Sequence, residues 1–388
     1  MRHYNFLTAE QRSHLFLHEP EEFDFTSDPF LLSNALGATL YCPATRPNLM
    51  HDIEKMAIRG AGSIVICLED SIPDDALPMA EENLHNTLLA LKERGDVSDL
   101  PLIFVRIRDA EHLHRVGEQN KGLLDSLTGF VFPKFENMTG SASRYVSMLR
   151  RINLTYSRPL FFMPVLESPN LVHLETRTKA LSGIKKVLDA NRELVLAVRI
   201  GATDMSSVYG IRRNPDFTVW DVGTISNTIT DIINVFGRFE DSYTITGAVW
   251  EHFSSGERIF KPQLRQSLFG EGWKLRRDLL NQGDDTFIRE IQQDKINGIF
   301  GKTIIHPSHI RIVHSLSVVS HEEYADALDI TDTGRKHGGA ASSFYKNKMN
   351  EIKPHYAWAT KTLLRAKAFG VSNQGIEFPD LLEASPVK

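Results

Sequence analysis

Two acidic residues, Glu167 and Asp204, each follow a run of apolar residues, LFFMPVLES (160–168) and LVLAVRIGATD (194–204). A carboxylate at the end of a buried strand is costly unless a partner neutralises its charge. Mg²⁺ commonly takes one or two protein carboxylates, keeps several waters and leaves positions for substrate oxygens. The pair therefore predicts a magnesium site if the two runs are neighbouring strands. The alternative is that the acids belong to helix caps, because Ser168 and Asp204 stand where N-cap residues belong.

Three charged residues in two other runs are candidate catalytic groups. Arg106 interrupts the apolar run LIFVRIRD (102–109), and a guanidinium suits two-point binding of a substrate carboxylate. Glu69 and Asp70 lie near the end of SIVICLEDS (63–71), where they are candidates to orient Arg106 or a water molecule, or to accept a proton. Strand alternation predicts that one acid faces the interior and the other the helix layer. The alternatives are a structural ion pair with Arg106 and a cap on the next helix.

Four further residues are candidates for binding a substrate or cofactor. Lys134 and Glu136 in GFVFPKFEN (129–137) are two residues apart, so a strand would place them on one face, where they could also simply pair with each other. Arg46 in ATRPN precedes an expected helix, whose first N–H groups also attract anions; the alternative is a surface arginine. His306 in IIHPS is either a base or ligand contact, or a loop histidine held by the following proline.

The elements that carry these residues follow a regular alternation. Short apolar runs recur along the chain, separated by longer stretches of helical periodicity such as 48–60 and 170–190. Strands that alternate with helices are typical of a parallel sheet covered by helices, and eight strands close a (β/α)8 TIM barrel. An open doubly wound sheet is the runner-up, but it usually carries a glycine-rich turn after its first strand, and YCPATRPN has none. The predicted class is therefore α/β, a TIM barrel whose polar strand ends meet at one face. The eight runs are 38–45, 63–71, 102–109, 129–137, 160–168, 194–204, 244–250 and 301–307.

The predicted barrel domain spans residues 38–320, with an N-terminal extension at 1–37 and a C-terminal helical extension at 321–388. In the first extension, Thr8 followed by Gln11 indicates a capping box and a short helix. In the second, the stretch 348–370 predicts a helix that Pro354 interrupts.

Composition narrows the class of partner. The 388 residues carry a net charge of −5, so no basic field favours nucleic acid or an anionic membrane. The two cysteines, Cys42 and Cys67, lie in apolar runs and form no disulfide framework. No run reaches the length of a membrane span, and the first residues lack the apolar core of a secretion signal. A cytoplasmic enzyme that acts on small molecules is the expectation.

As an ordered set, the motifs resemble the HpcH/HpaI aldolase and citrate lyase beta-subunit superfamily. They are LYCPATRPNLMHDIEKMAIRGAGSIVICLEDSIPDDA, FVRIRD, FPKFEN, PVLESP, RIGATDMSS and GKTIIHPSHI. The two extensions look most like the branch of carbon–carbon bond lyases found with tellurite-resistance genes. The resemblance implies a Mg²⁺-dependent barrel in which Glu167 and Asp204 bind the metal and Arg106 holds the substrate. It also implies a homo-oligomer.

Two segments depart from the thioester-using members of that superfamily. Their first loop commonly reads Pro-Gly-Asp-Arg-Pro and its arginine helps to bind coenzyme A, whereas the segment here is Pro43-Ala44-Thr45-Arg46-Pro47. They also carry Asp-Gly-Lys-Met near the C-terminus, whose Asp can act as an acid in a neighbouring subunit's site. The matching segment here, 346–349, reads Lys-Asn-Lys-Met. The resemblance therefore leaves coenzyme A and the acid–base partner open.

The predicted function is a lyase or aldolase that cleaves or forms a carbon–carbon bond next to a 2-oxo acid or acyl carbonyl, through a metal-stabilised enolate. One alternative is a thioester hydrolase or transferase, or an enzyme for a phosphorylated substrate, on the same barrel. The loop EHFSSGERIFKPQ (251–263) would hold the phosphate, through Ser254, Ser255, Gly256, Arg258 and Lys261. The other alternative is a barrel that serves as a scaffold without catalysis.

Overall fold

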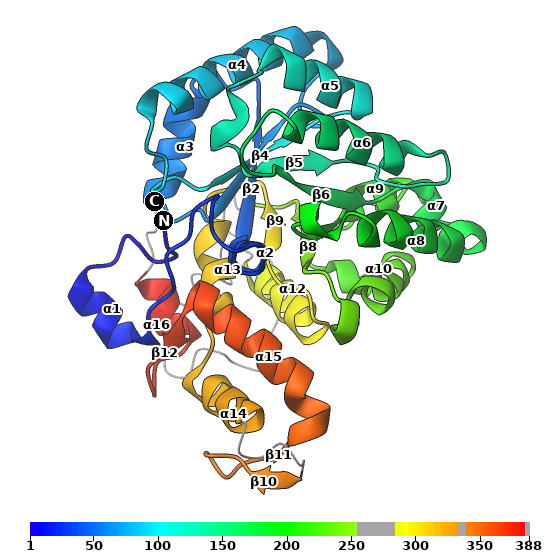
Figure 1. Ribbon diagram of the computed structural model, residues 1–388. Helices are drawn as coiled ribbons and strands as arrows, with labels where there is room; N and C mark the ends of the chain where they lie inside the picture. Colours follow the sequence, from blue (N-terminus) through cyan, green and yellow to red (C-terminus); the bar gives the residue numbers. More distant parts are fainter. Residues whose placement is uncertain (254–283, 333–338, 385–388) are drawn as a thin grey trace.

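Eight parallel strands close into a barrel, which confirms the predicted TIM-barrel fold and excludes the open sheet. The computed structural model describes residues 1–253, 284–332 and 339–384. Each strand falls within one of the eight apolar runs, and Figure 1 shows the helices arranged around them. The strands, in barrel order, are β2 (Ala38–Pro43), β3 (Ser63–Cys67), β4 (Leu102–Arg106), β5 (Gly129–Phe132), β6 (Phe161–Leu166), β7 (Val198–Ile200), β8 (Ile245–Trp250) and β9 (Lys302–Ile304).

Alternation along the strands divides the core into two layers. Val65, Phe104 and Val131 belong to a cluster inside the barrel. Their neighbours Ile64 and Val105 belong to the larger cluster between strands and helices. Because both faces of each strand are covered, the strands read as continuous apolar runs.

Helices follow the strands and cover the barrel. The expected helix at 170–190 is present as two pieces, since His173 has an extended backbone between them. The helices of this layer are α3 (Leu49–Ile58), α4 (Leu77–Arg94), α5 (Ala110–Gln119), α6 (Ser141–Asn153), α7 (Pro169–Val172), α8 (Leu174–Asp189), α9 (Ala202–Ser207), α10 (Gly223–Phe236), α12 (Asp285–Ile296) and α13 (His309–Ser317).

The N-terminal segment closes one end of the barrel. It forms α1 (Ala9–Leu15), β1 (Phe16–His18) and α2 (Pro29–Ala35), and the capping box of Thr8 and Gln11 is present as predicted. Leu32 of α2 and Phe369 join the cluster inside the barrel, together with the first residues of several strands. The end of the barrel where the strands begin is therefore filled, and the opposite end remains for a site.

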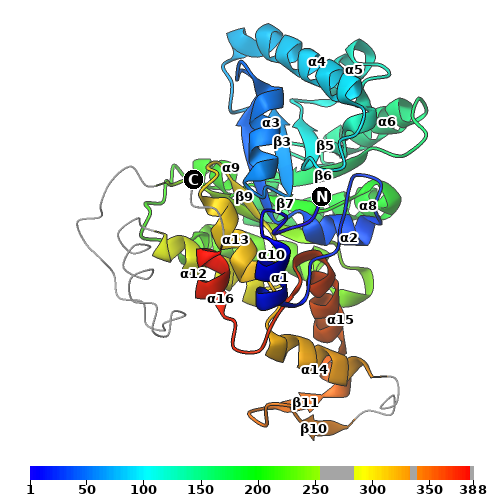
Figure 2. The same cartoon turned by 90° about the vertical axis from the view of Figure 1, so that its left-hand side faces the viewer.

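The C-terminal segment packs beside the barrel and returns to the N-terminal one. It forms α14 (His321–Thr331), a hairpin of β10 (Ala340–Ser342) and β11 (Met349–Glu351), α15 (Ile352–Phe369), β12 (Val371–Ser372) and α16 (Phe378–Glu383). β12 pairs with β1, and Figures 1 and 2 show α14 and the hairpin at the far end from α4 and α5.

The predicted interruption at Pro354 is wrong. Helix α15 begins at Ile352, so Pro354 lies in its first turn, where a missing N–H group costs no helical hydrogen bond. The residues just before it form strand β11 instead of a first helical piece.

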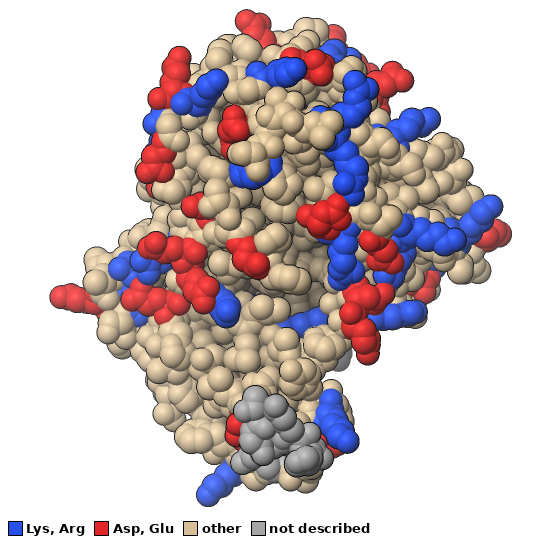
Figure 3. All heavy atoms as spheres, viewed as in Figure 1, with Lys and Arg blue, Asp and Glu red and all other residues tan. Residues whose placement is uncertain are grey.

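Charged side chains of both signs are interspersed over the face shown in Figure 3. Among the described residues, no helix is long and apolar enough to cross a bilayer.

Candidate active site

A cavity of about 290 Å³ opens where the barrel strands end. In TIM-barrel enzymes this face carries the chemistry. Four of its residues are predicted site residues: Arg106 ends β4, Asp70 and Glu167 follow β3 and β6, and Asp204 lies in α9 after β7. The cavity is lined by Tyr41, Cys67, Asp70, Ser71, Arg106, Val165, Glu167, Arg199, Ile200, Gly201, Thr203, Asp204, Val249, Glu251, Thr303 and Ile305.

Glu167 is the most buried acid of this cavity, at 3% exposure. Its Oε1 accepts a hydrogen bond from the Lys134 backbone N–H at 2.9 Å and lies 3.4 Å from Arg106 Nη2. Burial raises the pKa of Glu167 to about 8, with Asp204 adding to the rise and Arg106 opposing it. The second oxygen, Oε2, faces the backbone of Gly201, where a Cβ atom would lie only 2.0 Å away. A glycine at this position therefore leaves room for the carboxylate.

Asp204 lies one helical turn beyond the end of β7. Leu166 and Ile200 are partners in the β6–β7 register, so Glu167 and Gly201 follow them side by side. The N-cap of α9 is Gly201, and Asp204, which is 31% exposed, makes no capping hydrogen bond. Ser168 precedes α7 but its hydroxyl makes no cap bond either, and it is buried without a partner among the described residues. The helix-cap alternative is therefore wrong for Asp204, whereas Ser168 does stand at the N-cap position of α7 but forms no cap bond.

Arg106 joins three acids at the mouth of the barrel. Its Nη2 lies 2.5 Å from Glu69 Oε2, 3.2 Å from Asp70 Oδ2 and 3.4 Å from Glu167 Oε1. The expected split of Glu69 and Asp70 between two faces is wrong. Strand β3 ends at Cys67, so alternation no longer applies and both acids turn to Arg106. Arg106 therefore forms the structural ion pair that was the alternative prediction, and this ion pair does not exclude substrate binding.

Lys134 crosses the same mouth from the β5 side. Its Nζ lies 2.7 Å from Glu69 Oε1, 3.4 Å from Asp70 Oδ1 and 3.9 Å from Asp204 Oδ1. Burial alone would lower the pKa of Lys134, but Glu69 and the other acids raise it overall. Its backbone has a φ of +48°, an uncommon conformation for a residue with a side chain. In this turn the Lys134 N–H reaches Glu167, so the strained residue ties β5 to β6.

None of the four predicted binding residues lines the cavity: Lys134 reaches acids at its mouth, and the other three make contacts elsewhere. Glu136 turns away from Lys134, because β5 ends at Phe132, and it accepts hydrogen bonds from Met138, Thr139 and Asn170. Arg46 is half exposed and forms a two-point ion pair with Asp52.

His306 lies just beyond β9. Its Nδ1 is 2.7 Å from Ser308 Oγ, and its ring stacks on Phe253 at 5.1 Å between centroids. The predicted phosphate loop, Ser254, Ser255, Gly256, Arg258 and Lys261, lies outside the described residues.

Among the charged and aromatic residues of the cavity, sequence reasoning missed Arg199, Tyr41 and Glu251. Arg199 is 1% exposed and donates to the hydroxyls of Thr39 and Thr303, at 3.3 and 2.6 Å. The Tyr41 ring lies between two guanidinium carbons, 5.6 Å from that of Arg199 and 6.0 Å from that of Arg106. The signal for Arg199, an arginine inside an apolar strand, is the one that identified Arg106.

The charges of the site fit a divalent cation. Its acids exceed its bases by two when all are ionised, and buried carboxylates in excess need a cation. Among the residues that the structure describes, no group of three or more metal-ligating side chains occurs. Mg²⁺ needs only one or two protein carboxylates and keeps several waters, and Glu167 and Asp204 could supply those carboxylates. The acids are Glu69, Asp70, Glu167, Asp204 and Glu251, and the bases are Arg106, Lys134 and Arg199.

The fold and site define a TIM-barrel enzyme with an acidic cavity at the strand ends. A family profile described as the C–C bond lyase of the TIM-barrel fold matches residues 30–371. The chain therefore belongs to this family of carbon–carbon bond lyases.

Solved structures support the fold. A citrate lyase from Burkholderia xenovorans LB400 is 15% identical, with a TM-score of 0.59 over 89% of this chain and 96% of that one. The protein CitE from Mycobacterium tuberculosis, in complex with magnesium, acetoacetate and coenzyme A, is 20% identical, with a TM-score of 0.51 over 85% of this chain and 97% of that one. No curated protein sequence matches the chain.

Proposed function

We propose that the protein is a Mg²⁺-dependent lyase that cleaves or forms a carbon–carbon bond next to the carbonyl of a 2-oxo acid or acyl group. The observation that carries the proposal is the pair Glu167 and Asp204, which follow the neighbouring strands β6 and β7 and line a cavity with two excess negative charges. These two residues would hold the ion, which supplies positive charge beside a carbonyl oxygen. The magnesium and acetoacetate named for the CitE structure support the same chemistry.

Arg106 binds the substrate in this proposal. It lines the cavity, and its guanidinium can exchange one acidic partner for a substrate carboxylate or carbonyl oxygen. Its positive charge then stabilises the negative charge that develops on the carbonyl oxygen when the bond breaks. Glu69 touches both Arg106 and Lys134 and does not itself line the cavity, so it is a positioning residue that holds the two cations.

Asp70 accepts the proton of the departing hydroxyl in the cleavage direction. It lines the cavity and its side chain is 51% exposed, so a substrate can reach it. Burial would raise the pKa of Asp70, but Glu69, Arg106 and Lys134 lower it overall, and the group is ionised at neutral pH. A positioned acid or base contributes about 10²- to 10⁴-fold to a rate.

Coenzyme A remains an open partner of this function. Arg46 matches the arginine that helps to bind coenzyme A in the thioester-using members. Here it forms an ion pair with Asp52 and does not line the cavity. A free 2-oxo acid is the simpler substrate for a cavity of about 290 Å³. We expect a homo-oligomer, which sedimentation at micromolar concentration would test.

The proposal is tested by calorimetric titration with Mg²⁺ and by an assay of 2-oxo acid release from 4-hydroxy-2-oxo acids, in which the bond between carbons 3 and 4 breaks and the 2-oxo acid leaves as the enolate. Glu167→Ala and Asp204→Ala each lose Mg²⁺ binding and metal-dependent turnover, whereas Glu136→Ala, in the loop beside the site, keeps Mg²⁺ binding. Full activity in either of the first two variants would refute the assignment.

A further inference from the structure

A second cavity, larger than the first, lies beside the opposite end of the barrel. Its volume is about 1020 Å³, and it is bounded by α12, α13, α14, α15 and α16. It also touches Phe239 and Phe300, in the loops that lead into β8 and β9, so it lies near the strand starts. It shares no lining residue with the cavity of Glu167 and Asp204.

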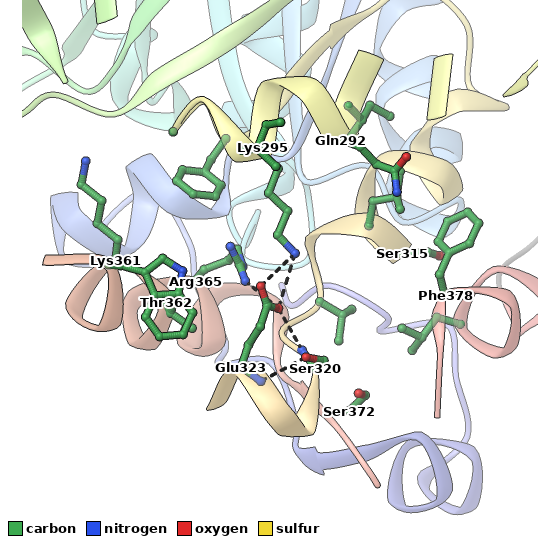
Figure 4. A pocket seen from close by; sticks show the side chains of 18 of the residues that line it. Gln292, Lys295, Ser315, Ser320, Glu323, Lys361, Thr362, Arg365, Ser372 and Phe378 are labelled. Carbon is green, nitrogen blue, oxygen red and sulfur yellow. Dashed lines mark hydrogen bonds and ion pairs between the residues drawn. The ribbon is translucent and has the colours of Figure 1, made fainter. Parts of the chain in front are cut away.

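The polar part of this cavity holds more cations than acids. Lys295, from α12, and Arg365, from α15, share one carboxylate, that of Glu323. Lys295 Nζ lies 3.3 Å from Glu323 Oε1, and Arg365 Nη2 lies 3.0 Å from Oε2. Figure 4 shows the three side chains converging from separate helices. Lys361 adds a third cation, whose Nζ donates to the Gly237 carbonyl at 3.3 Å.

The remaining acid at this cavity does not balance the charge. Glu377 is exposed at the rim, where its carboxylate caps the first turn of α16. Lys361 and Arg365 lie four residues apart on one helix, an arrangement in which like charges repel.

Arg365 lacks one hydrogen-bond acceptor, and burial disfavours the charge of the two lysines in the cavity. Arg365 is 5% exposed, and its Nε is buried without a hydrogen-bond acceptor in the described parts of the chain. Burial lowers the pKa of Lys361, and it lowers that of Lys295 to about 8, with Arg365 adding to the second effect and Glu323 opposing it. A guanidinium N–H without an acceptor, beside a Lys361 ammonium that has no carboxylate partner among the described residues, is what a site for an anion would offer.

The rest of the wall is apolar. Ile291, Leu316, Trp358, Phe378 and Leu381 contribute to it, together with Phe300, over whose ring Arg365 lies at 5.4 Å. Pockets for small organic molecules combine such a wall with a few convergent polar groups. The cavity therefore matches a molecule with one anionic end and an apolar body.

We propose that this cavity is a second ligand site, which binds a small organic anion, a carboxylate or phosphate on an apolar body. Its place at the far end of the barrel makes the ligand an effector or a stored metabolite and not the substrate of the candidate active site.

The test is calorimetric titration of the whole protein with decanoate, decyl phosphate, decanol and inorganic phosphate. The two amphipathic anions bind. Decanol binds at least about tenfold more weakly, the factor expected for the loss of one charge-assisted contact. Inorganic phosphate also binds at least about tenfold more weakly, because it has no apolar body to bury against the wall. The ratio of decanoate to decyl phosphate affinity identifies the anionic group that the site prefers.

Matched variants locate the binding. Lys361→Met weakens decanoate binding about tenfold and Lys361→Glu weakens it further, whereas Lys367→Met, an exposed lysine on the same helix, has no effect. Asp204→Ala binds decanoate like the unmodified protein. Equal affinity for decanol or for inorganic phosphate, an unchanged affinity in Lys361→Met, or loss of binding in Asp204→Ala would overturn the proposal. The proposal would also be overturned if sedimentation showed a dimer that Lys361→Glu dissociates and that decanoate does not dissociate.

Discussion

At the scale of single residues, the charged groups that interrupt apolar runs define the site. Arg106, Glu167 and Asp204 were predicted from this signal, and all three line one cavity. Arg199 carries the same signal and was missed, because attention to the polar residues that follow the strand passed over a residue inside β7. Glu136 was wrongly predicted to lie on the same face as Lys134. That prediction assumed strand alternation, which stops where β5 ends at Phe132.

Arg106 is predicted to tolerate no replacement by lysine. Its guanidinium contacts Glu69, Asp70 and Glu167 at once, and an ammonium group cannot reproduce that geometry. We expect Arg106→Lys to lower kcat/KM for cleavage about 10²-fold or more, in line with the loss of a group that stabilises developing charge.

The neighbouring Arg108 is the control for that variant. It binds the Leu68 carbonyl and Asp74, and it does not line the cavity. Arg108→Lys should change kcat/KM little. A similar loss in both variants would mean that the effect is structural and not specific to the substrate.

Asp70 and Glu69 are predicted to differ in the kinetic parameter that they change. Asp70→Asn removes the proton acceptor, so kcat falls about 10²-fold or more while binding of a 2-oxo acid persists. Glu69→Gln releases Arg106 and Lys134, so substrate affinity falls as well. Steady-state kinetics with a calorimetric Kd for the oxo acid separate the two effects, and an unchanged kcat in Asp70→Asn would exclude its role as the base.

At the scale of elements, the turn from β7 into α9 is the part of the barrel that shapes the site. Gly201 has a φ of −103°, which alanine also adopts, so the backbone conformation does not require glycine here. The glycine serves instead to leave space for a neighbouring side chain. A Cβ atom there would lie 2.0 Å from Glu167 Oε2 and 2.5 Å from its Cβ. The Glu167 side chain must move if residue 201 has a side chain.

Gly201→Ala is therefore predicted to weaken Mg²⁺ binding about tenfold or more, and to lower the free energy of unfolding by about 1–3 kcal/mol, the usual cost of overpacking. Gly223→Ala is the matched control, since nothing lies within 4 Å of its added Cβ at the start of α10. Calorimetry and urea unfolding measure the two quantities. Unchanged Mg²⁺ affinity in Gly201→Ala would show that the position of Glu167 does not matter.

The strands could be predicted from the sequence more accurately than the helix ends could. A run of apolar residues identifies a strand covered on both faces, and all eight runs contain one. Pro354 was read as a break because a proline inside a helical pattern usually ends it. The rule fails here since the helix starts only two residues before the proline, and no N-cap side chain marks that start.

At the scale of the whole molecule, the two chain ends are joined through contacts that the sequence did not predict. β1 pairs with β12, and His3 stacks on Phe369 with ring centroids 4.2 Å apart. Strands of two or three residues carry no recognisable pattern, and their partners are more than 350 positions away. The extensions thus appeared as separate additions in sequence, whereas in the fold they form one layer against the barrel.

Three buried histidines make this fold sensitive to acid. Burial lowers the pKa of His3 and of His309 to about 3, and it lowers that of His314 well below the usual value of 6.5. Below pH 6.5 the unfolded chain binds protons that the folded chain does not. The contribution of these histidines to the free energy of unfolding is therefore greatest above about pH 6.5, and it falls toward pH 3 by up to about 1.4 kcal/mol per pH unit for each histidine.

His309 allows a direct check, because both of its ring nitrogens are buried without a partner in the described chain and its ring lies 4.7 Å from Phe287. His309→Phe should reduce the loss of stability between pH 7 and pH 5, measured by urea unfolding. His51→Gln, at an exposed position, should leave the pH dependence unchanged. Equal slopes in the unmodified protein and in His309→Phe would contradict this account.

The measurement that tests the central claim most directly is a calorimetric titration with pyruvate or oxaloacetate, with and without Mg²⁺, on the unmodified protein and on Asp204→Ala. The account predicts that the oxo acid binds only when Mg²⁺ is present and that Asp204→Ala abolishes this binding. Mg²⁺ binding without any oxo acid binding would reject the substrate class. Failure of the unmodified protein to bind either one would contradict the account itself and favour a barrel that serves as a scaffold.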